Sequence, residues 1–263
     1  MFGSAVDICP AETPNQLASV EGVSDLAFVG KKLYASIAVG CSRGHPETPA
    51  GIYRIDDGSW TLEANVSAFV QANPVANPPA DFEPDGDIYS MVAAGGVLYA
   101  AEANNGRVLR IKPNPGRVEL LADVSATQGH VVPTAIAVFR DEILVGELRP
   151  FPAVPGAAQI LRYSRNGELE GTIGGFTTIL GVETDNKGNI YVLEPFTCPS
   201  SAPCLPAPGT GRVTRIAPDG TRTVIATGLS FATSLRLGPD GALYVSNFGF
   251  GPPGMGEIVR ITF

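Results

Sequence analysis

Lysine is scarce in this 263-residue sequence, and its scarcity bears on which partners are possible. Four lysines stand among 18 basic residues, the net charge is -8, and the arginines are spread along the chain. Because nucleic acids are bound by clustered Lys and Arg side chains that meet the phosphates, we expect no nucleic-acid partner. Long apolar runs are also missing, and none reaches the roughly 18 residues of a membrane-spanning helix, so we expect no membrane span.

Histidine is scarcer still, with His45 in "CSRGHPETP" and His130 in "TQGHVVP". A catalytic triad needs a positioned base and an acid that orients it, and neither stretch offers such a pair. We therefore interpret both histidines as loop residues, and the sequence predicts no catalytic residue of this kind.

The four cysteines lack the Cys-x-x-Cys spacing that marks a zinc site. Cys198 and Cys204 close a short proline-rich loop that a disulfide can span, and Cys9 and Cys41 are the remaining candidate pair. Two disulfides would indicate an extracellular or periplasmic location, whereas four free thiols would indicate the cytosol. The start "MFGSAVDICP" has no signal-peptide pattern, so either the protein stays inside the cell or its leader is missing.

Glycine and proline, in contrast, are abundant, with 31 and 23 residues. They separate short apolar runs, often within Pro-Asp-Gly or Asn-Gly turns, and no long stretch keeps a 3.6-residue apolar period. This pattern predicts an all-β chain of many short strands.

A repeat orders these strands. One motif recurs as "LYASI", "LYAAE", "ILVGE", "IYVLE" and "LYVSN", and its tyrosines and leucine at 34, 99, 144, 191 and 244 are 45 to 65 residues apart. A second motif follows each copy and always carries an arginine; these residues are Arg54, Arg110, Arg162, Arg215 and Arg260. A third segment precedes each pair, and a fourth follows most of them, which gives four strands per unit.

Units of this length and strand number are typical of β-propeller blades. We therefore predict a single β-propeller domain over residues 1–263, with five four-stranded blades visible. The last unit stops after its third strand at Phe263, and the segment 15–22 resembles a fourth strand, so we expect the N-terminal strand to close the ring. A β-sandwich is the alternative, but it gives no reason for five equivalent arginines.

The stretch 131–163 holds "VPT", "VGEL", "FP" and "GAA" in this order, and it resembles the ScyD/ScyE family of propellers, relatives of NHL and SMP-30-like propellers. The resemblance continues through 82–91, 176–194 and 238–249. It implies six blades, so this chain is either a closed five-bladed form or a six-bladed parent that lacks its first blade. It also implies an exported protein whose biochemical role is poorly defined.

Candidate site residues lie where the second strand of each unit ends. This position holds Ile37 in the first unit and the four candidates Glu102, Glu147, Glu194 and Asn247 in the others. Equivalent positions of a propeller form a ring, and carboxylate and amide oxygens suit a hard cation such as Ca²⁺, so these residues are candidates for a metal or ligand site. The alternative is architectural: the glutamates pair with the five repeated arginines and fasten neighbouring strands.

Two functions remain open at this point. The first is an exported, non-catalytic scaffold that binds a small molecule, a glycan or a protein at its loop face or central channel. The second is a hydrolase of the SMP-30-like or strictosidine-synthase-like class, with a divalent metal held by the glutamate ring. No cofactor other than possible Ca²⁺ is implied.

Overall fold

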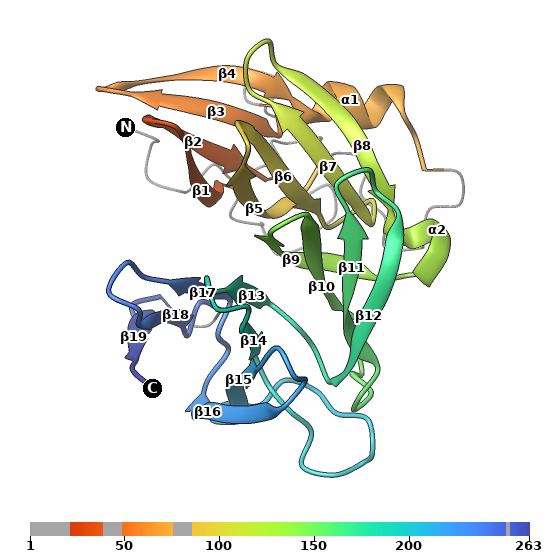
Figure 1. The fold of residues 1–263 in the computed structure, drawn as a ribbon, viewed down its shortest axis with the longest axis vertical. Helices are drawn as coiled ribbons and strands as arrows, with labels where there is room; N and C mark the ends of the chain where they lie inside the picture. The colour runs from red at the N-terminus through yellow and green to blue at the C-terminus, as the bar shows by residue number, and fades with distance from the viewer. Residues whose placement is uncertain (1–21, 39–48, 76–85, 251–252) are drawn as a thin grey trace. The chain divides into compact units, whose positions relative to one another are not determined.

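The computed structural model describes residues 22–38, 49–75, 86–250 and 253–263. Over these residues the chain is a β-propeller of five antiparallel sheets, in which each strand pairs with the next one along the chain (Figure 1). The chain divides into two compact units, Met1–Pro133 and Thr134–Phe263, and we describe each by itself.

The first unit holds two four-stranded sheets, each followed by a short helix. Its elements are β1 Val23–Val29, β2 Lys32–Ile37, β3 Gly51–Asp56, β4 Ser59–Asn65, α1 Val66–Ala72, β5 Ile88–Ala94, β6 Val97–Glu102, β7 Arg107–Lys112, β8 Arg117–Asp123 and α2 Val124–Gln128.

The second unit holds three sheets, the last with three described strands. Its elements are β9 Val132–Phe139, which begins just before the boundary between the units, β10 Glu142–Leu148, β11 Ala158–Ser164, β12 Leu169–Phe176, β13 Gly181–Thr184, β14 Ile190–Glu194, β15 Gly211–Ile216, β16 Arg222–Leu229, β17 Ser234–Leu237, β18 Leu243–Asn247 and β19 Glu257–Ile261.

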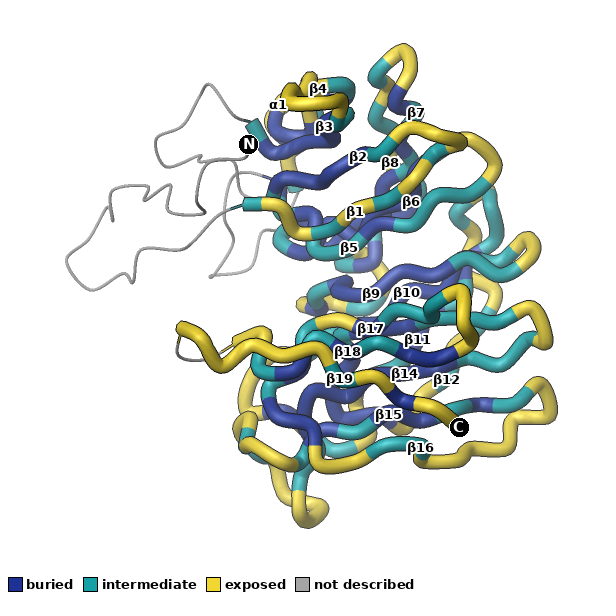
Figure 2. The backbone as a smooth tube through the Cα atoms, turned by 90° about the vertical axis from the view of Figure 1, so that its left-hand side faces the viewer, coloured by how far each residue is buried: buried dark blue, intermediate teal, exposed yellow. Residues whose placement is uncertain are grey.

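The second strand of each sheet is the most buried, which explains why its motif is the clearest repeat. Strands β6, β10 and β14 are buried along almost their whole length, whereas the outer strands β12 and β16 alternate or expose most positions (Figure 2). A strand covered on both faces needs apolar residues at successive positions, and a half-covered one needs them only at every second position.

Each repeated arginine on a third strand lies opposite the repeated tyrosine or leucine of the second strand. The paired residues are Tyr34 and Arg54, Tyr99 and Arg110, Leu144 and Arg162, Tyr191 and Arg215, and Tyr244 and Arg260. The five predicted units and their second and third strands are therefore confirmed, and the five pairs share one register. Five separate up-and-down sheets are also not the topology of a β-sandwich.

The two ends of each sheet carry different connections. In the second unit, strands at one end are joined by the short turns 140–141, 165–168, 185–189, 217–221 and 238–242. The opposite end holds the longer connections 149–157, 195–210 and 248–256, together with 177–180 and 230–233. Binding residues concentrate on long loops that a rigid scaffold positions, so a binding site is expected at this second end, which we call the loop end.

Helices α1 and α2 were not predicted. Each begins directly after a fourth strand, where the side chain of Asn65 accepts a hydrogen bond from Ala68 N at 2.8 Å and that of Asp123 accepts one from Ala126 N at 3.0 Å. These are N-cap bonds, which satisfy donors that a helix leaves unpaired in its first turn. Within the described ranges, no helix is long and apolar enough to cross a membrane.

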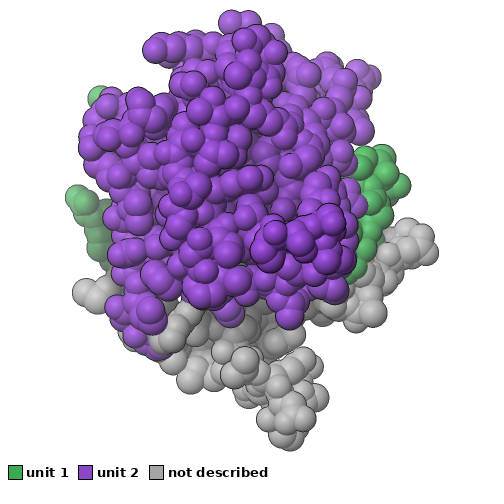
Figure 3. Space-filling view, turned by 90° about the horizontal axis from the view of Figure 1, so that it is seen from below, with its two compact units in different colours: residues 1–133 green, residues 134–263 purple. Residues whose placement is uncertain are grey.

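Figure 3 colours the two compact units separately. The expected single domain over residues 1–263 and the closure of the ring by the N-terminal strand remain predictions, because the segment 15–21 lies outside the described residues.

Candidate functional site

In three of the five sheets, the side chain at the end of the second strand accepts a hydrogen bond from the segment that leads into the first strand. The side-chain oxygens of Glu102, Glu194 and Asn247 accept the backbone N–H groups of Asp87 at 3.0 Å, Thr177 at 2.8 Å and Ser230 at 2.8 Å. Each donor lies just ahead of the first strand of the same sheet. The shared feature is thus a side-chain oxygen that accepts a backbone N–H group ahead of the first strand, and a carboxylate or an amide can provide this oxygen.

Glu102 is fully buried and makes most of its bonds to the following loop. Its carboxylate also accepts from Asn105 N and, at 2.8 Å, from Asn105 Nδ2. Arg107 stands opposite in register, but its guanidinium donates to the carbonyl oxygen of Asn73 at 2.6 Å. Burial therefore dominates and raises the pKa of Glu102 to about 7, although the bonds from Asn105 and Asp87 oppose the shift.

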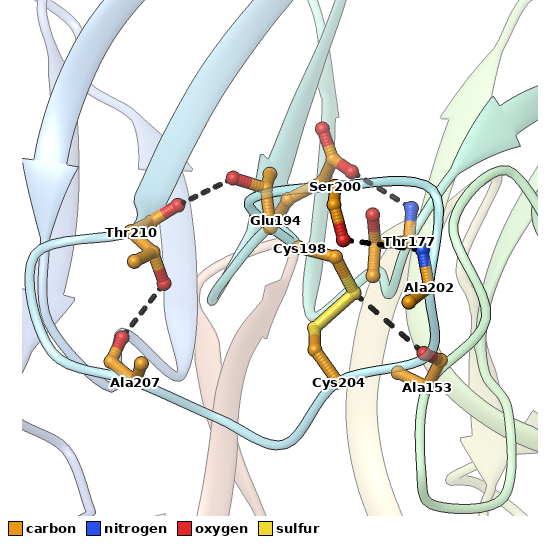
Figure 4. Close-up of a disulfide and its surroundings, with 10 residues drawn as sticks. Ala153, Thr177, Glu194, Cys198, Ser200, Ala202, Cys204, Ala207 and Thr210 are labelled. Carbon is orange, nitrogen blue, oxygen red and sulfur yellow. Dashed lines mark hydrogen bonds between the residues drawn. A yellow bond between two sulfur atoms is a disulfide. The ribbon is translucent and has the colours of Figure 1, made fainter.

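Glu194 is 0% exposed and has an arginine as its partner. Its Oε2 lies 2.5 Å from Nε of Arg212, the residue opposite it in register on β15. Its Oε1 accepts a hydrogen bond from Thr177 N, which Figure 4 shows. Both carboxylate oxygens are thereby engaged within the sheet.

Glu147 departs from this pattern. Its Oε1 accepts from Arg149 at 2.8 Å and 2.7 Å, whereas its buried Oε2 has no hydrogen-bond partner among the described residues. Burial raises the pKa of Glu147, and the nearby Arg149 charge offsets part of the shift. In the fifth sheet Asn247 donates to Glu257 at 2.8 Å, so a carboxylate replaces the arginine there.

This geometry bears on the metal hypothesis. Within the described ranges, no three His, Cys, Asp or Glu side chains are grouped so that they could hold a metal ion. The oxygens of Glu102 and Glu194 are already occupied by backbone, amide and guanidinium donors. The donor set thus fits a structural fastening better than an oxygen cage for Ca²⁺.

The repeated arginines have other acidic partners. Arg54 pairs with Asp56 at 2.9 Å and with Glu63 at 2.5 Å, Arg162 pairs with Glu142, and Arg260 pairs with Asp240 at 2.8 Å. These carboxylates lie near the short-turn end of the sheets or on outer strands.

The other two repeated arginines also lie away from the strand-end glutamates. Arg110 approaches Glu119 at 3.8 Å, and Arg215 faces Tyr191. The glutamates at 147 and 194 are held by Arg149 and Arg212, which the sequence analysis did not single out.

A disulfide shapes the loop end of the second unit. Cys198 and Cys204 are bonded, as predicted, and close a loop between β14 and β15 (Figure 4). Cys204 also exchanges two backbone hydrogen bonds with Ala153, of 2.8 Å and 2.9 Å, which ties this loop to the 149–157 connection. The predicted pair Cys9 and Cys41 lies outside the described residues.

The tied loops present apolar side chains to solvent. Phe151 is 50% exposed and Leu205 is 65% exposed, and Val154 is exposed as well. Val154 and Leu205 directly follow the two bridge residues, Ala153 and Cys204. Phe151 stacks on Phe196 with 6.0 Å between ring centroids, which fixes its orientation. We call Phe151, Val154 and Leu205 the apolar loop surface. Sequence reasoning missed it, because exposed and buried apolar residues look alike in a proline-rich stretch.

Comparisons with known proteins support the fold. Searches of protein-family models and of curated proteins find no match. Among solved structures, the nidogen/laminin complex matches with a TM-score of 0.58 and 14% identity over 87% of this chain and 73% of that chain. Streptogramin B lyase matches at 0.54 and 15% identity, over 96% and 67% of the two chains. An extracellular domain from B. thetaiotaomicron matches at 0.52 and 13% identity, over 95% of this chain and 28% of that one.

Proposed function

We propose that this chain is an exported β-propeller of the ScyD/ScyE type that binds a protein partner through its apolar loop surface. The observation that carries the proposal is the exposure of Phe151, Val154 and Leu205 on loops that a disulfide and a backbone bridge hold in place. Exposed apolar groups on a rigid frame are typical of interfaces, since little conformational entropy is lost on binding.

Location and partner class are supported by separate arguments. A disulfide persists in an oxidising compartment, which supports an extracellular or periplasmic location. The B. thetaiotaomicron domain is extracellular, and the nidogen structure is a complex with laminin, so the same fold serves both roles elsewhere. A small molecule or a glycan at the loop end is the other partner class, and it would use polar groups rather than these three side chains.

Removing the apolar groups should weaken partner capture strongly. We expect the double variant Phe151→Ser, Leu205→Ser to lose about tenfold or more in affinity, because anchor side chains contribute most of the energy of an interface. The measurement is the amount of protein that immobilised wild type and variant retain from the culture fluid of the producing cells, identified by mass spectrometry.

The control is Leu169→Ser, an exposed leucine on the outer strand β12 of the same unit. It should leave capture unchanged, and circular dichroism should show that all three proteins are folded. Equal capture by the double variant and the wild type would contradict the proposal.

One observation favours the hydrolase alternative. The buried Oε2 of Glu147 has no hydrogen-bond partner among the described residues and could serve as a ligand for a divalent ion. We expect the architectural outcome. Calcium and EDTA should give equal melting temperatures, and Glu147→Gln should lower stability by about 1–3 kcal/mol under both conditions, because Arg149 loses a charged partner.

Thermal melts of wild type, Glu147→Gln and the control Glu142→Gln test this. The control removes a carboxylate from a half-exposed pair with Arg162, so its effect should be smaller. A calcium-induced rise in the melting temperature of the wild type that Glu147→Gln abolishes would favour the metal-dependent enzyme.

A further inference from the structure

A pocket of about 300 Å³ lies in the second unit, between the outer strand β16 and the disulfide loop. Its walls include Thr197 and Pro199 on either side of Cys198, Thr210 and Arg212 at the start of β15, and Thr227 on β16. The lining contains a single charged side chain and several hydroxyl groups. Its volume is at the lower end of the range for small-molecule sites.

The charged group, the guanidinium of Arg212, is held in position by a buried carboxylate. Arg212 Nε bonds to Oε2 of the buried Glu194, and Thr177 N fixes the other oxygen of that carboxylate. The arginine side chain is 35% exposed, and over the part of the chain that the structure describes its Nη1 and Nη2 groups have no hydrogen-bond partner. The guanidinium therefore offers its outer edge, with two parallel N–H groups, in a fixed orientation that suits a bidentate carboxylate.

The hydroxyl groups add acceptors rather than charge. Thr197 Oγ1 donates to the carbonyl oxygen of Thr210 at 3.0 Å, and Thr210 Oγ1 donates to that of Ala207 at 2.7 Å. Since each hydroxyl uses its proton inside the loop, its lone pairs remain to accept hydrogen bonds from a ligand. No aromatic ring lines the pocket, so a ligand would be recognised by hydrogen bonds and charge rather than by stacking.

Glycine at position 211 lets these walls approach each other. A Cβ atom there would lie 2.7 Å from the carbonyl oxygen of Pro195 and 3.0 Å from Leu229, which is too close. The start of β15 thus packs directly on its neighbours and places Arg212 beside the threonines of the loop.

We propose that this pocket binds a small hydroxylated carboxylate of the acidic monosaccharide class. The carboxylate would take the outer edge of Arg212, and ring hydroxyl groups would donate to Thr197 and Thr210. The site offers one guanidinium, whose charge Glu194 already balances, so the free N–H groups suit a monoanion better than a phosphate dianion, which needs more positive charge. The proposal extends the binding role argued above to a second, separate site and does not depend on the apolar loop surface.

Isothermal titration with sodium glucuronate, using methyl glucoside as the uncharged comparison, tests this proposal. We expect saturable binding of glucuronate and none of methyl glucoside. Arg212→Gln should weaken binding by about tenfold or more, because a charge-assisted bidentate bond is lost. The matched control is Arg215→Gln on the same strand, which does not line the pocket and should bind as the wild type does.

A second variant keeps the test decisive if Arg212→Gln fails to fold. Thr227 is exposed and faces Arg212 across the β15–β16 pair, so Thr227→Phe should fill the pocket and cover the outer edge of Arg212 while leaving both members of the Glu194–Arg212 pair in the chain. It too should weaken binding by about tenfold or more. Equal binding of both ligands by the wild type, or unchanged glucuronate binding in Thr227→Phe, would overturn the proposal. Neither result would affect partner capture by the apolar loop surface, which the serine variants test separately.

Discussion

Glu194→Ala should lower the free energy of unfolding by about 2 kcal/mol or more, because the substitution removes a fully buried carboxylate that accepts a charged and a backbone hydrogen bond. The carboxylate is fully buried, lies 2.5 Å from Arg212 Nε and also holds the N–H group of Thr177 at 2.8 Å. Its loss would leave a charge without a partner and a backbone donor unsatisfied, and each carries its own cost. Urea unfolding followed by circular dichroism measures the change.

The matched control lies on the neighbouring strand. Glu183 on β13 pairs with Arg236 at 3.1 Å, but both side chains are partly exposed, so Glu183→Ala should cost about 1 kcal/mol or less. If the two variants were equally stable, the strand-end carboxylate would not be the fastening that its geometry indicates.

The protein should also lose stability as the pH rises from about 5 to about 8, by about 2–3 kcal/mol through Glu102 alone. Burial raises the pKa of this carboxyl to about 7 in the folded protein, whereas its ordinary value is 4.5. The folded state therefore holds the proton more tightly than the unfolded state. The resulting stability is fully present below pH 4.5 and disappears as the pH rises through 7. The raised pKa of Glu147 acts in the same direction.

Glu102→Gln isolates this contribution, because glutamine keeps the shape of the side chain and does not titrate. The unfolding free energies of wild type and variant should be measured across the same pH range. The wild type should lose stability relative to the variant as the pH rises. Their difference should change by the amount given above, while other titrating groups cancel. A difference that stays constant with pH would show that Glu102 ionises normally in the folded protein.

The sequence predicted the repeating part of this fold because that part is local. Tyr34 and Arg54, or Tyr244 and Arg260, mark strands two and three in the same way in every unit, and the register follows. The buried strands can be predicted for the same reason, since a strand that is covered on both faces must be apolar at successive positions.

The site could not be predicted equally well, because it depends on connections of unequal length. The partner of Glu194 is Arg212, which lies beyond the loop 195–210, whereas Arg107 faces Glu102 after only four intervening residues. With loops that vary so widely, the sequence does not show which arginine stands opposite which glutamate. The candidate residues at 102, 147, 194 and 247 lie at or next to the ends of their second strands, and their role in metal or ligand binding remains a proposal.

The hydrogen bonds made by the side chains at the ends of the second strands also bear on how the chain folds. Glu102, Glu194 and Asn247 bond to donors only 15, 17 and 17 residues earlier in the sequence. Contacts of such short sequence separation close small loops at little entropic cost and favour rapid folding. Each of these three sheets can therefore position its own first strand as soon as its second strand has emerged from the ribosome, before the next sheet has been synthesised.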